Sequence, residues 1–369
     1  MARAGFFSGW RGLGRFWAVV LLLLGGGAVT LQMLGPPRAS PPTQAIAATA
    51  SHVAPSAPQP PAPQTSESQP PVRQTAHVAP HDQKVTPSER PGSITPGPIP
   101  DPDPALLASS PKSHTDMMPQ VAPDGRKAWN VYAAGFDRGT MRARVGLVLA
   151  GIGMNEADSL TAARDLPGAV TLAVSPYAVH LDKILSAARL AGHEYLLSLP
   201  MEPTEFPLND PGQQALLTSL PPEQNLDRLY WAMSRLAGYV GATNALATMR
   251  GERFSGMGDQ MAMVLKELDH RGLIFIDARV GEKPPAGVWS RSIDMIIDDV
   301  ATREAIEAKL NELARLAADK GSAVGLASVP RPITVERIAA WTNGLMGKGL
   351  ILAPVTSLVS RPSEPRADK

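Results

Sequence analysis

Two kinds of apolar pattern divide the chain. Near the N-terminus, residues 16–34 form an apolar run that only Thr30 and Gln32 interrupt. From Arg144 onward, short apolar runs alternate instead with longer segments whose apolar residues recur at helical spacing. Alternation of buried strands with amphipathic helices is typical of a parallel sheet covered by helices. The second part of the chain is therefore predicted to be an α/β domain.

The elements of this domain follow from the pattern. The expected strands are Val145–Ala150, Val170–Val174, Tyr195–Leu199, a weaker one at Val240–Asn244, Leu273–Asp277, Met295–Ile297, Ala323–Ala327 and Leu350–Ala353. The expected helices are Glu156–Arg164, Leu181–Ala191, Pro222–Leu236, Asp259–Arg271, Arg303–Lys320 and Val335–Met346. Glycines follow several of these helices, where a left-handed residue ends a helix: Gly192, Gly272, Gly321 and Gly349. This repetition predicts a distorted (β/α) barrel, with a doubly wound open sheet as the alternative.

The N-terminal run predicts a membrane anchor. Arg3, Arg11 and Arg15 precede it, and a stretch of about 20 apolar residues is long enough to cross a bilayer. Basic residues on the N-terminal side favour a cytoplasmic N-terminus. We therefore predict a transmembrane helix within residues 1–35, a single-pass inner-membrane protein, and a folded domain in the periplasm. A cleaved signal peptide is the alternative.

Composition changes between the anchor and the domain. Residues 36–130 are rich in Pro, Ala, Ser and Gln and poor in large apolar residues. Such a segment buries too little surface to offset the entropy of ordering, so we predict a disordered linker over 36–130. The folded domain is then predicted to span 131–360, and 361–369 to form a disordered tail.

Charge and cysteine content exclude several classes of function. The formal net charge is +1 and no basic stripe is present, so nucleic acid is not an expected partner. The chain has no cysteine, which excludes disulfides and thiol chemistry.

Candidate site residues follow the expected strands, because α/β barrels place their sites at the carboxyl ends of strands. Glu202 lies in a Pro-rich loop, and Asp277 and Asp298 end two later strands. These carboxylates suit a hard cation or an acid/base pair; the alternative is that they cap helices or pair with arginines such as Arg253 or Arg279. No histidine lies at an expected strand end, so a His-based zinc site is not predicted.

Several motifs identify a resemblance. The segment GHEYLLSLPMEP is followed by NDPG, ALLTSLPPEQNLDRL, GYVGATN, GLIFIDAR, DMIID, AIEAKL and GLASVPRPITVERIAAW. In this order they resemble the divergent polysaccharide deacetylase family, from about Val145 to Leu358. The resemblance implies a (β/α) barrel-like fold related to carbohydrate esterases that remove acetyl groups with a divalent metal. It also implies export to the cell envelope.

The chain departs from the family where active members carry their metal ligands and base. The Asp-Asp pair at the end of the first strand is replaced by Ala150 and Gly151, and Asn244 is followed by Ala245 rather than a histidine. Two further family histidines correspond to Ser198 and Val329. The resemblance thus indicates a branch that lacks the usual metal ligands. No cofactor is expected. A divalent metal such as zinc is expected only if the domain is active.

The predicted function is that of an envelope protein in cell-wall glycan metabolism that is degenerate at the metal site and acts as a glycan-binding or regulatory pseudoenzyme. Its expected partner is cell-wall polysaccharide or peptidoglycan. Glu202 and Asp277 are the candidate catalytic residues, and Tyr177, Asn244 and Asp298 the candidate substrate-binding residues. One alternative is an active carbohydrate deacetylase or hydrolase with a reorganised carboxylate site. The other is a structural scaffold for another envelope protein.

Overall fold

The computed structural model describes Trp17 and residues 95–360. The chain divides into two compact units, Met1–Ala79 and Pro80–Lys369, and every described residue except Trp17 belongs to the second unit. Among the described residues, no helix combines the length and the apolar character that spanning a bilayer requires. The predicted anchor apart from Trp17, residues 36–94 of the predicted linker, and the predicted tail lie outside the described residues.

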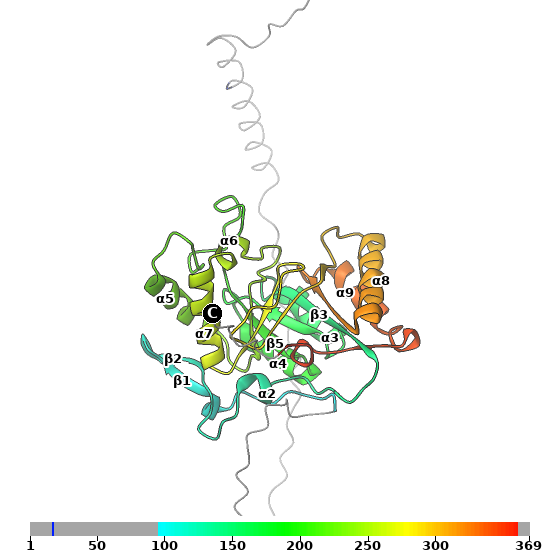
Figure 1. Ribbon diagram of the computed structural model, residues 1–369, viewed down its shortest axis with the longest axis horizontal. Coiled ribbons are helices and arrows are strands. Elements are labelled where there is room, and N and C mark those ends of the chain that lie inside the picture. The colour runs from blue at the N-terminus through cyan, green and yellow to red at the C-terminus, as the bar shows by residue number, and fades with distance from the viewer. Residues whose placement is uncertain (1–16, 18–94, 361–369) are drawn as a thin grey trace, which may run out of the picture. The chain divides into compact units, whose positions relative to one another are not determined.

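A curled parallel sheet forms the centre of the second unit (Figure 1). Its order in the described part of the chain is β8-β7-β6-β5-β4-β3-β10-β9, and β11 pairs with β3. All pairings between these strands are parallel. The strands are β3 (Ala143–Ile152), β4 (Thr171–Val174), β5 (Tyr195–Ser198), β6 (Gly241–Thr243), β7 (Ile274–Asp277), β8 (Ser290–Ser292), β9 (Met295–Ile296), β10 (Ser322–Ala327) and β11 (Leu350–Leu352).

One short segment supplies both edges of the main strand order. Residues 290–292 form β8 and pair with β7, whereas residues 295–296 form β9 and pair with β10. Because only Ile293 and Asp294 separate the two strands, the sheet must curl until its edges approach each other. The predicted α/β fold is confirmed in the form of a curled parallel half-barrel. Strand β8 was not predicted from the sequence.

Helices cover the sheet with their apolar faces. They are α3 (Glu156–Asp165), α4 (Leu181–Ala191), α5 (Pro222–Met233), α7 (Gly258–His270), α8 (Arg303–Lys320), α9 (Pro332–Thr342) and the short α2 (Ala128–Val131) and α6 (Glu252–Ser255). Figure 1 shows α8 beside α9, with α5 and α7 on the other side of the sheet. A Cβ added to Gly325 of β10 would lie 2.8 Å from Leu313 of α8, so that helix rests directly on the strand.

Two of the predicted glycine helix ends are confirmed, whereas the helix predicted at Val335–Met346 is α9, which ends at Thr342, and Gly349 follows a 3-10 turn. Helices α4 and α8 have the predicted bounds, and each ends at a glycine in the left-handed region, Gly192 with φ 84° and Gly321 with φ 81°. A residue without a Cβ adopts this conformation without steric strain, and its backbone then turns the chain away from the helix axis.

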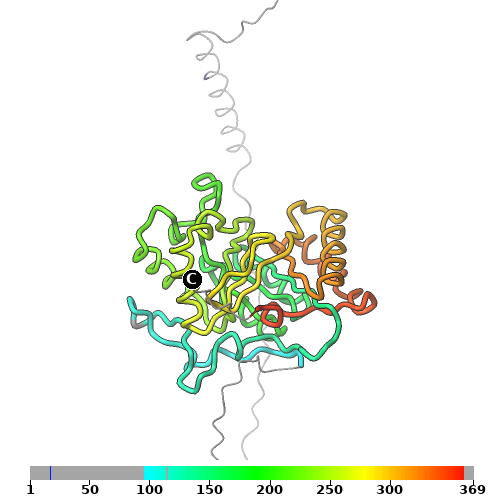
Figure 2. Tube along the Cα trace, viewed as in Figure 1, coloured from blue at the N-terminus to red at the C-terminus, as the bar shows by residue number. Residues whose placement is uncertain are grey.

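The predicted linker ends too late in the sequence, because residues 104–131 are folded. They form a 3-10 turn η1 (Pro104–Leu106), the antiparallel strands β1 (Leu107–Ser110) and β2 (Ser113–Pro119), and helix α2. Leu106, Met118 and Trp129 are at most 2% exposed and join the main core. Figure 2 follows this segment in cyan along one edge of the domain. A few anchoring apolar residues offset its proline-rich composition, which is why the average composition misled the prediction.

Both ends of the described domain lie at the amino-terminal edge of the sheet. The backbone nitrogen of Ile99 donates to the carbonyl of Arg189, which lies just before β5. At the other end, Ser360 forms an antiparallel bridge with Ser290, the first residue of β8. Neither end of the described segment 95–360 therefore lies at the carboxyl-terminal edge, where the site was predicted.

Candidate functional site

Glu202 ties three segments of the chain together. Its Oε2 accepts hydrogen bonds from the backbone nitrogen and the hydroxyl of Thr218, at 2.6 and 2.8 Å, and its Oε1 accepts one from Arg253 at 2.9 Å. Glu202 is only 3% exposed. Burial alone would raise its pKa, but the bonds from Arg253 and Thr218 outweigh burial and hold the pKa below the ordinary value of 4.5. The carboxylate is thus ionised and already occupied by donors.

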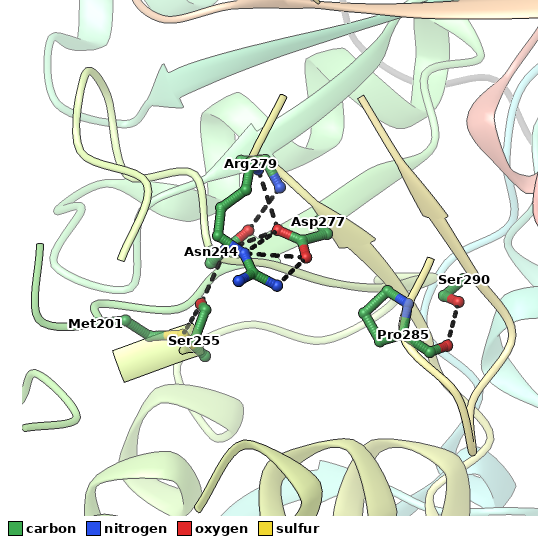
Figure 3. A network of polar contacts seen from close by, with 8 residues as sticks. Met201, Asn244, Ser255, Asp277, Arg279, Pro285 and Ser290 are labelled. Carbon is green, nitrogen blue, oxygen red and sulfur yellow. Dashed lines mark hydrogen bonds and ion pairs between the residues drawn. The ribbon is translucent and has the colours of Figure 1, made fainter. Parts of the chain in front are cut away.

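Asp277 and Asn244 form a closed polar network (Figure 3). Asp277 is fully buried, and its Oδ2 accepts a hydrogen bond of 2.6 Å from the guanidinium of Arg279. The Asn244 amide donates to Asp277 Oδ1 at 3.1 Å and to the Ser255 hydroxyl at 3.0 Å, while its oxygen accepts from the Ala278 nitrogen at 2.7 Å. Asn244 thus links Asp277 to Ser255, which is on α6. These contacts brace this edge of the sheet.

Asp298 is also saturated by neighbours. Its Oδ1 accepts from the backbone nitrogen of Ser328 at 2.7 Å, and its Oδ2 accepts from Val329 at 3.3 Å and from Arg331 at 3.2 Å. The alternative interpretation of the carboxylates, that they pair with arginines, therefore describes all of them: Glu202, Asp277 and Asp298 each bind one guanidinium and at least one backbone amide.

The residues at this edge do not fit a divalent metal. Within Trp17 and residues 95–360, no group of three or more His, Asp or Glu side chains lies close enough to hold a metal ion. The space beside Gly151 is filled as well: an added Cβ would lie 3.1 Å from the Ser328 carbonyl oxygen and 3.3 Å from Pro330. The loop after β10 thus occupies the place where an acidic side chain at position 151 would extend.

A separate pocket of about 690 Å³ opens at the carboxyl edge of the sheet, and it contains Tyr177. Its lining comes from the loops after β3, β4, β5 and β6 and from α5: Gly153, Met154, Ser175, Tyr177, Ala178, Val179, Asp210, Pro211, Gly212, Gln213, Gln214, Trp231, Leu246 and Met249. Of the predicted site residues, only Tyr177 lines this pocket. Glu202, Asn244, Asp277 and Asp298 do not.

An aromatic pair forms one side of the pocket. The rings of Tyr177 and Trp231 lie 5.2 Å apart between centroids and are tilted by 42°. Arg235 lies over the Trp231 ring, with its Cζ 5.6 Å from the centroid, and donates through Nε to the Pro176 carbonyl. Arg235, which follows α5, thereby joins the end of that helix to the loop before α4. This contact holds Trp231 and Tyr177 beside each other.

The loop after β5 holds Tyr177 from the opposite side. The backbone nitrogen of Gln214 donates to the Tyr177 hydroxyl at 3.1 Å. Gly212 has φ 99°, and a Cβ there would lie 2.8 Å from both Cζ and the hydroxyl oxygen of Tyr177. Burial raises the pKa of Tyr177 above its ordinary value of 10.0, so at neutral pH the hydroxyl keeps its hydrogen for donation to a ligand.

Sequence reasoning missed Trp231. The residue lies in the last turn of α5, which ends at Met233 and not at the predicted Leu236, and an aromatic side chain on a helix is most often part of the core. No local signal distinguishes it, since its partner Tyr177 is on another element. For the acidic residues, the arginine and amide partners likewise become visible only when the loops are in place.

Comparison with known proteins assigns the chain to a family. Residues 147–359 match the model of the divergent polysaccharide deacetylase family, which is more than half of the chain. The chain belongs to this family.

Three known proteins are similar to the chain. An uncharacterized protein, ATU2773, from Agrobacterium tumefaciens C58 is 31% identical, with a TM-score of 0.61 over 66% of this chain and 99% of that one. The uncharacterized protein YibQ of Escherichia coli is 25% identical over 53% of this chain, and the match spans 61% of YibQ. A family 4 carbohydrate esterase from Streptomyces lividans, solved with acetate, has 15% identity and a TM-score of 0.37, over 60% of this chain and 98% of that one.

Proposed function

We propose that this protein binds cell-wall glycan in the envelope through the pocket around Tyr177 and Trp231, and that it does not carry out metal-dependent deacetylation. The aromatic pair in the pocket at the carboxyl edge is the observation that carries the proposal. The family supplies the substrate class, because its described name is that of polysaccharide deacetylases.

The chemistry of the pocket suits a sugar. A pyranose ring has an apolar face of C–H groups and a rim of hydroxyls. Aromatic side chains combine a large apolar face with low conformational entropy, and binding pockets of this size typically combine apolar walls with a few polar groups. Here Tyr177 and Trp231 offer the faces, while Asp210, Gln213 and Gln214 offer polar groups for the rim.

The saturated carboxylates support the second half of the proposal. Metal-dependent deacetylation requires an ion that polarises the carbonyl oxygen and activates a water. Binding such an ion through Glu202, Asp277 or Asp298 would require each carboxylate to release an arginine and backbone amides. Leaving those cations and amides without partners is unfavourable in a buried setting.

The location in the envelope is part of the proposal. It rests on the basic residues and apolar run of 1–35, which favour an inner-membrane anchor with the domain in the periplasm. The described chain ends lie at the amino edge of the sheet. The pocket lies at the opposite, carboxyl edge of the sheet.

Retention on purified peptidoglycan tests the proposal. The full-length chain, purified in detergent, is incubated with sacculi, and the bound fraction is measured for wild type and Trp231→Ala. We expect binding to weaken at least about tenfold, as for a buried aromatic contact. The control is Tyr230→Ala, because Tyr230 neighbours Trp231 on α5 but does not line the pocket.

Two results would overturn the proposal. Equal retention of wild type and Trp231→Ala would show that the pocket does not bind glycan. Release of acetate from peptidoglycan by the wild-type chain, dependent on an added divalent metal, would show that the deacetylase reaction survives.

A further inference from the structure

The loop between β6 and α6 forms a second wall of the pocket. Leu246 and Met249 exchange backbone hydrogen bonds of 2.8 and 3.0 Å and so close a tight turn. Both residues line the pocket, as does the loop after β5. Ala247, at the tip of the turn, has φ 51°, a left-handed conformation that is unfavourable for a residue with a Cβ. The turn therefore depends on contacts outside itself to keep this shape.

One ion pair supplies such a contact. Arg250, directly after the turn, lies 3.1 Å through its guanidinium from Asp299 Oδ1. Asp299 follows β9, and in the described sheet β9 and β6 are not neighbours. No strand pairing therefore holds these two loops together.

The far end of this ion pair is firmly positioned. Asp298, the preceding residue, is 2% exposed and accepts hydrogen bonds from the Ser328 and Val329 nitrogens and from Arg331. Asp299 itself is largely exposed, with 65% of its side chain accessible, whereas Arg250 is 21% accessible. A firmly held segment thus presents the Asp299 carboxylate to the half-buried guanidinium of Arg250. The pair can be removed without opening the core.

We propose that Arg250 and Asp299 are positioning residues that hold the Leu246–Met249 wall against bound glycan and so set its affinity. This inference rests on the proposed glycan-binding function. Neither side chain lines the pocket, so both act through the wall. When the ion pair is absent, ligand binding must also order the turn and its Leu246 and Met249 side chains, and that ordering opposes binding.

Charge reversal provides the test. Dissociation constants for muramidase-solubilised peptidoglycan fragments are measured by calorimetry on the full-length chain for wild type, Arg250→Ala, Asp299→Ala, the double alanine variant, and the exchanged pair Arg250→Asp with Asp299→Arg. Each single variant is expected to bind roughly three- to tenfold more weakly. The double variant should be no weaker than either single variant, because the same interaction is lost, and the exchanged pair should recover affinity.

Salt and a matched control separate positioning from general stability. An exposed ion pair is screened by salt, so wild-type affinity should fall with ionic strength more steeply than that of Arg250→Ala. The control Lys309→Ala removes a comparably exposed pair with Glu312 on α8, far from the pocket in sequence, and should leave affinity unchanged. Melting temperatures of all variants are recorded in parallel.

The failures are distinguishable. If the wild-type chain does not bind the fragments, the proposed function fails and this inference fails with it. If the wild type binds and both single variants bind equally well, only the inference is overturned. Loss of affinity that follows loss of melting temperature, without recovery in the exchanged pair, also overturns it.

Discussion

Glu202 and Thr218 are joined twice, since both the backbone nitrogen and the hydroxyl of Thr218 donate to the same carboxylate oxygen, at 2.6 and 2.8 Å. The link places the loop that contains Gly212 and Gln214 beside the end of β5, and those two residues hold Tyr177. Glu202 was predicted to be catalytic. Its contacts describe instead a residue that shapes a pocket that it does not line.

Thr218→Ala tests this link through pH. The pKa of Glu202 lies below 4.5, so its ionised form stabilises the fold above that pH, and the stabilisation is lost as pH falls through the folded-state pKa. We expect Thr218→Ala to lower the free energy of unfolding by about 1–2 kcal/mol near neutral pH. The difference from wild type should shrink in acid. Urea unfolding at several pH values measures it.

The control for this experiment is Thr204→Ala, because Thr204 is exposed in the same loop. A difference between wild type and Thr218→Ala that stays constant from neutral to acid pH would contradict the role given to the hydroxyl.

Asp277→Asn should lower the free energy of unfolding and should not act through a catalytic role. Asp277 is fully buried and pairs with the Arg279 guanidinium at 2.6 Å. Removing one charge of a buried pair leaves the other without a partner and typically costs about 3–5 kcal/mol. Because Arg279 is partly accessible, we expect a loss of about 3 kcal/mol or less. Chemical denaturation measures the loss, with Asp319→Asn as an exposed control. A stable variant that no longer retains peptidoglycan would restore Asp277 as a site residue.

The sequence predicted the secondary structure of this protein better than the contacts of its candidate site residues. Strand and helix positions followed from local periodicity, and Gly192 and Gly321 marked helix ends because a single backbone angle is needed there. The partners of the candidate carboxylates could not be predicted because they are distant in the sequence: Glu202 and Arg253 are 51 residues apart, and Asp298 and Ser328 are 30 apart. Local patterns carry no information on which loops meet at the sheet edge.

Glu194 provides a pH test at the amino edge of the sheet. It is fully buried and accepts hydrogen bonds from the Ala134 nitrogen, the Thr171 hydroxyl, and the nitrogen and hydroxyl of Thr356. Burial raises its pKa above 4.5 despite these donors. The folded state then binds a proton more tightly than the unfolded state, so stability should fall as pH rises from about 4.5 through the folded-state pKa.

The comparison variant is Glu194→Gln, which cannot titrate. Its unfolding free energy should lack this decline, so the difference between wild type and variant should narrow as pH rises. Denaturant titrations from acid to neutral pH measure both proteins. Parallel pH profiles would show that Glu194 does not titrate in this range.

Zinc should not stabilise the wild-type domain. A ligand that binds only the folded state at 100 times its dissociation constant adds about 2.7 kcal/mol of stability, which is readily visible as a rise in melting temperature. Because the carboxylates at the sheet edge bind arginines, we expect no such rise with zinc, manganese or magnesium. A saturable rise that Asp277→Asn or Glu202→Gln abolishes would contradict the assignment of these carboxylates to structural pairs.

Gly212→Ala should weaken glycan binding by displacing Tyr177. The new Cβ would lie 2.8 Å from Cζ and from the hydroxyl oxygen of the tyrosine, closer than a packed structure allows, and φ at this position is 99°. The matched control is Gly281→Ala, which also has positive φ, 76°, but has no neighbour within 4 Å of the added Cβ. Both variants bear the backbone strain of about 1–3 kcal/mol for a residue with a Cβ in this region. Only Gly212→Ala moves the Tyr177 ring, so peptidoglycan retention should fall in that variant alone. Equal retention in the two variants would show that Tyr177 has no role in binding.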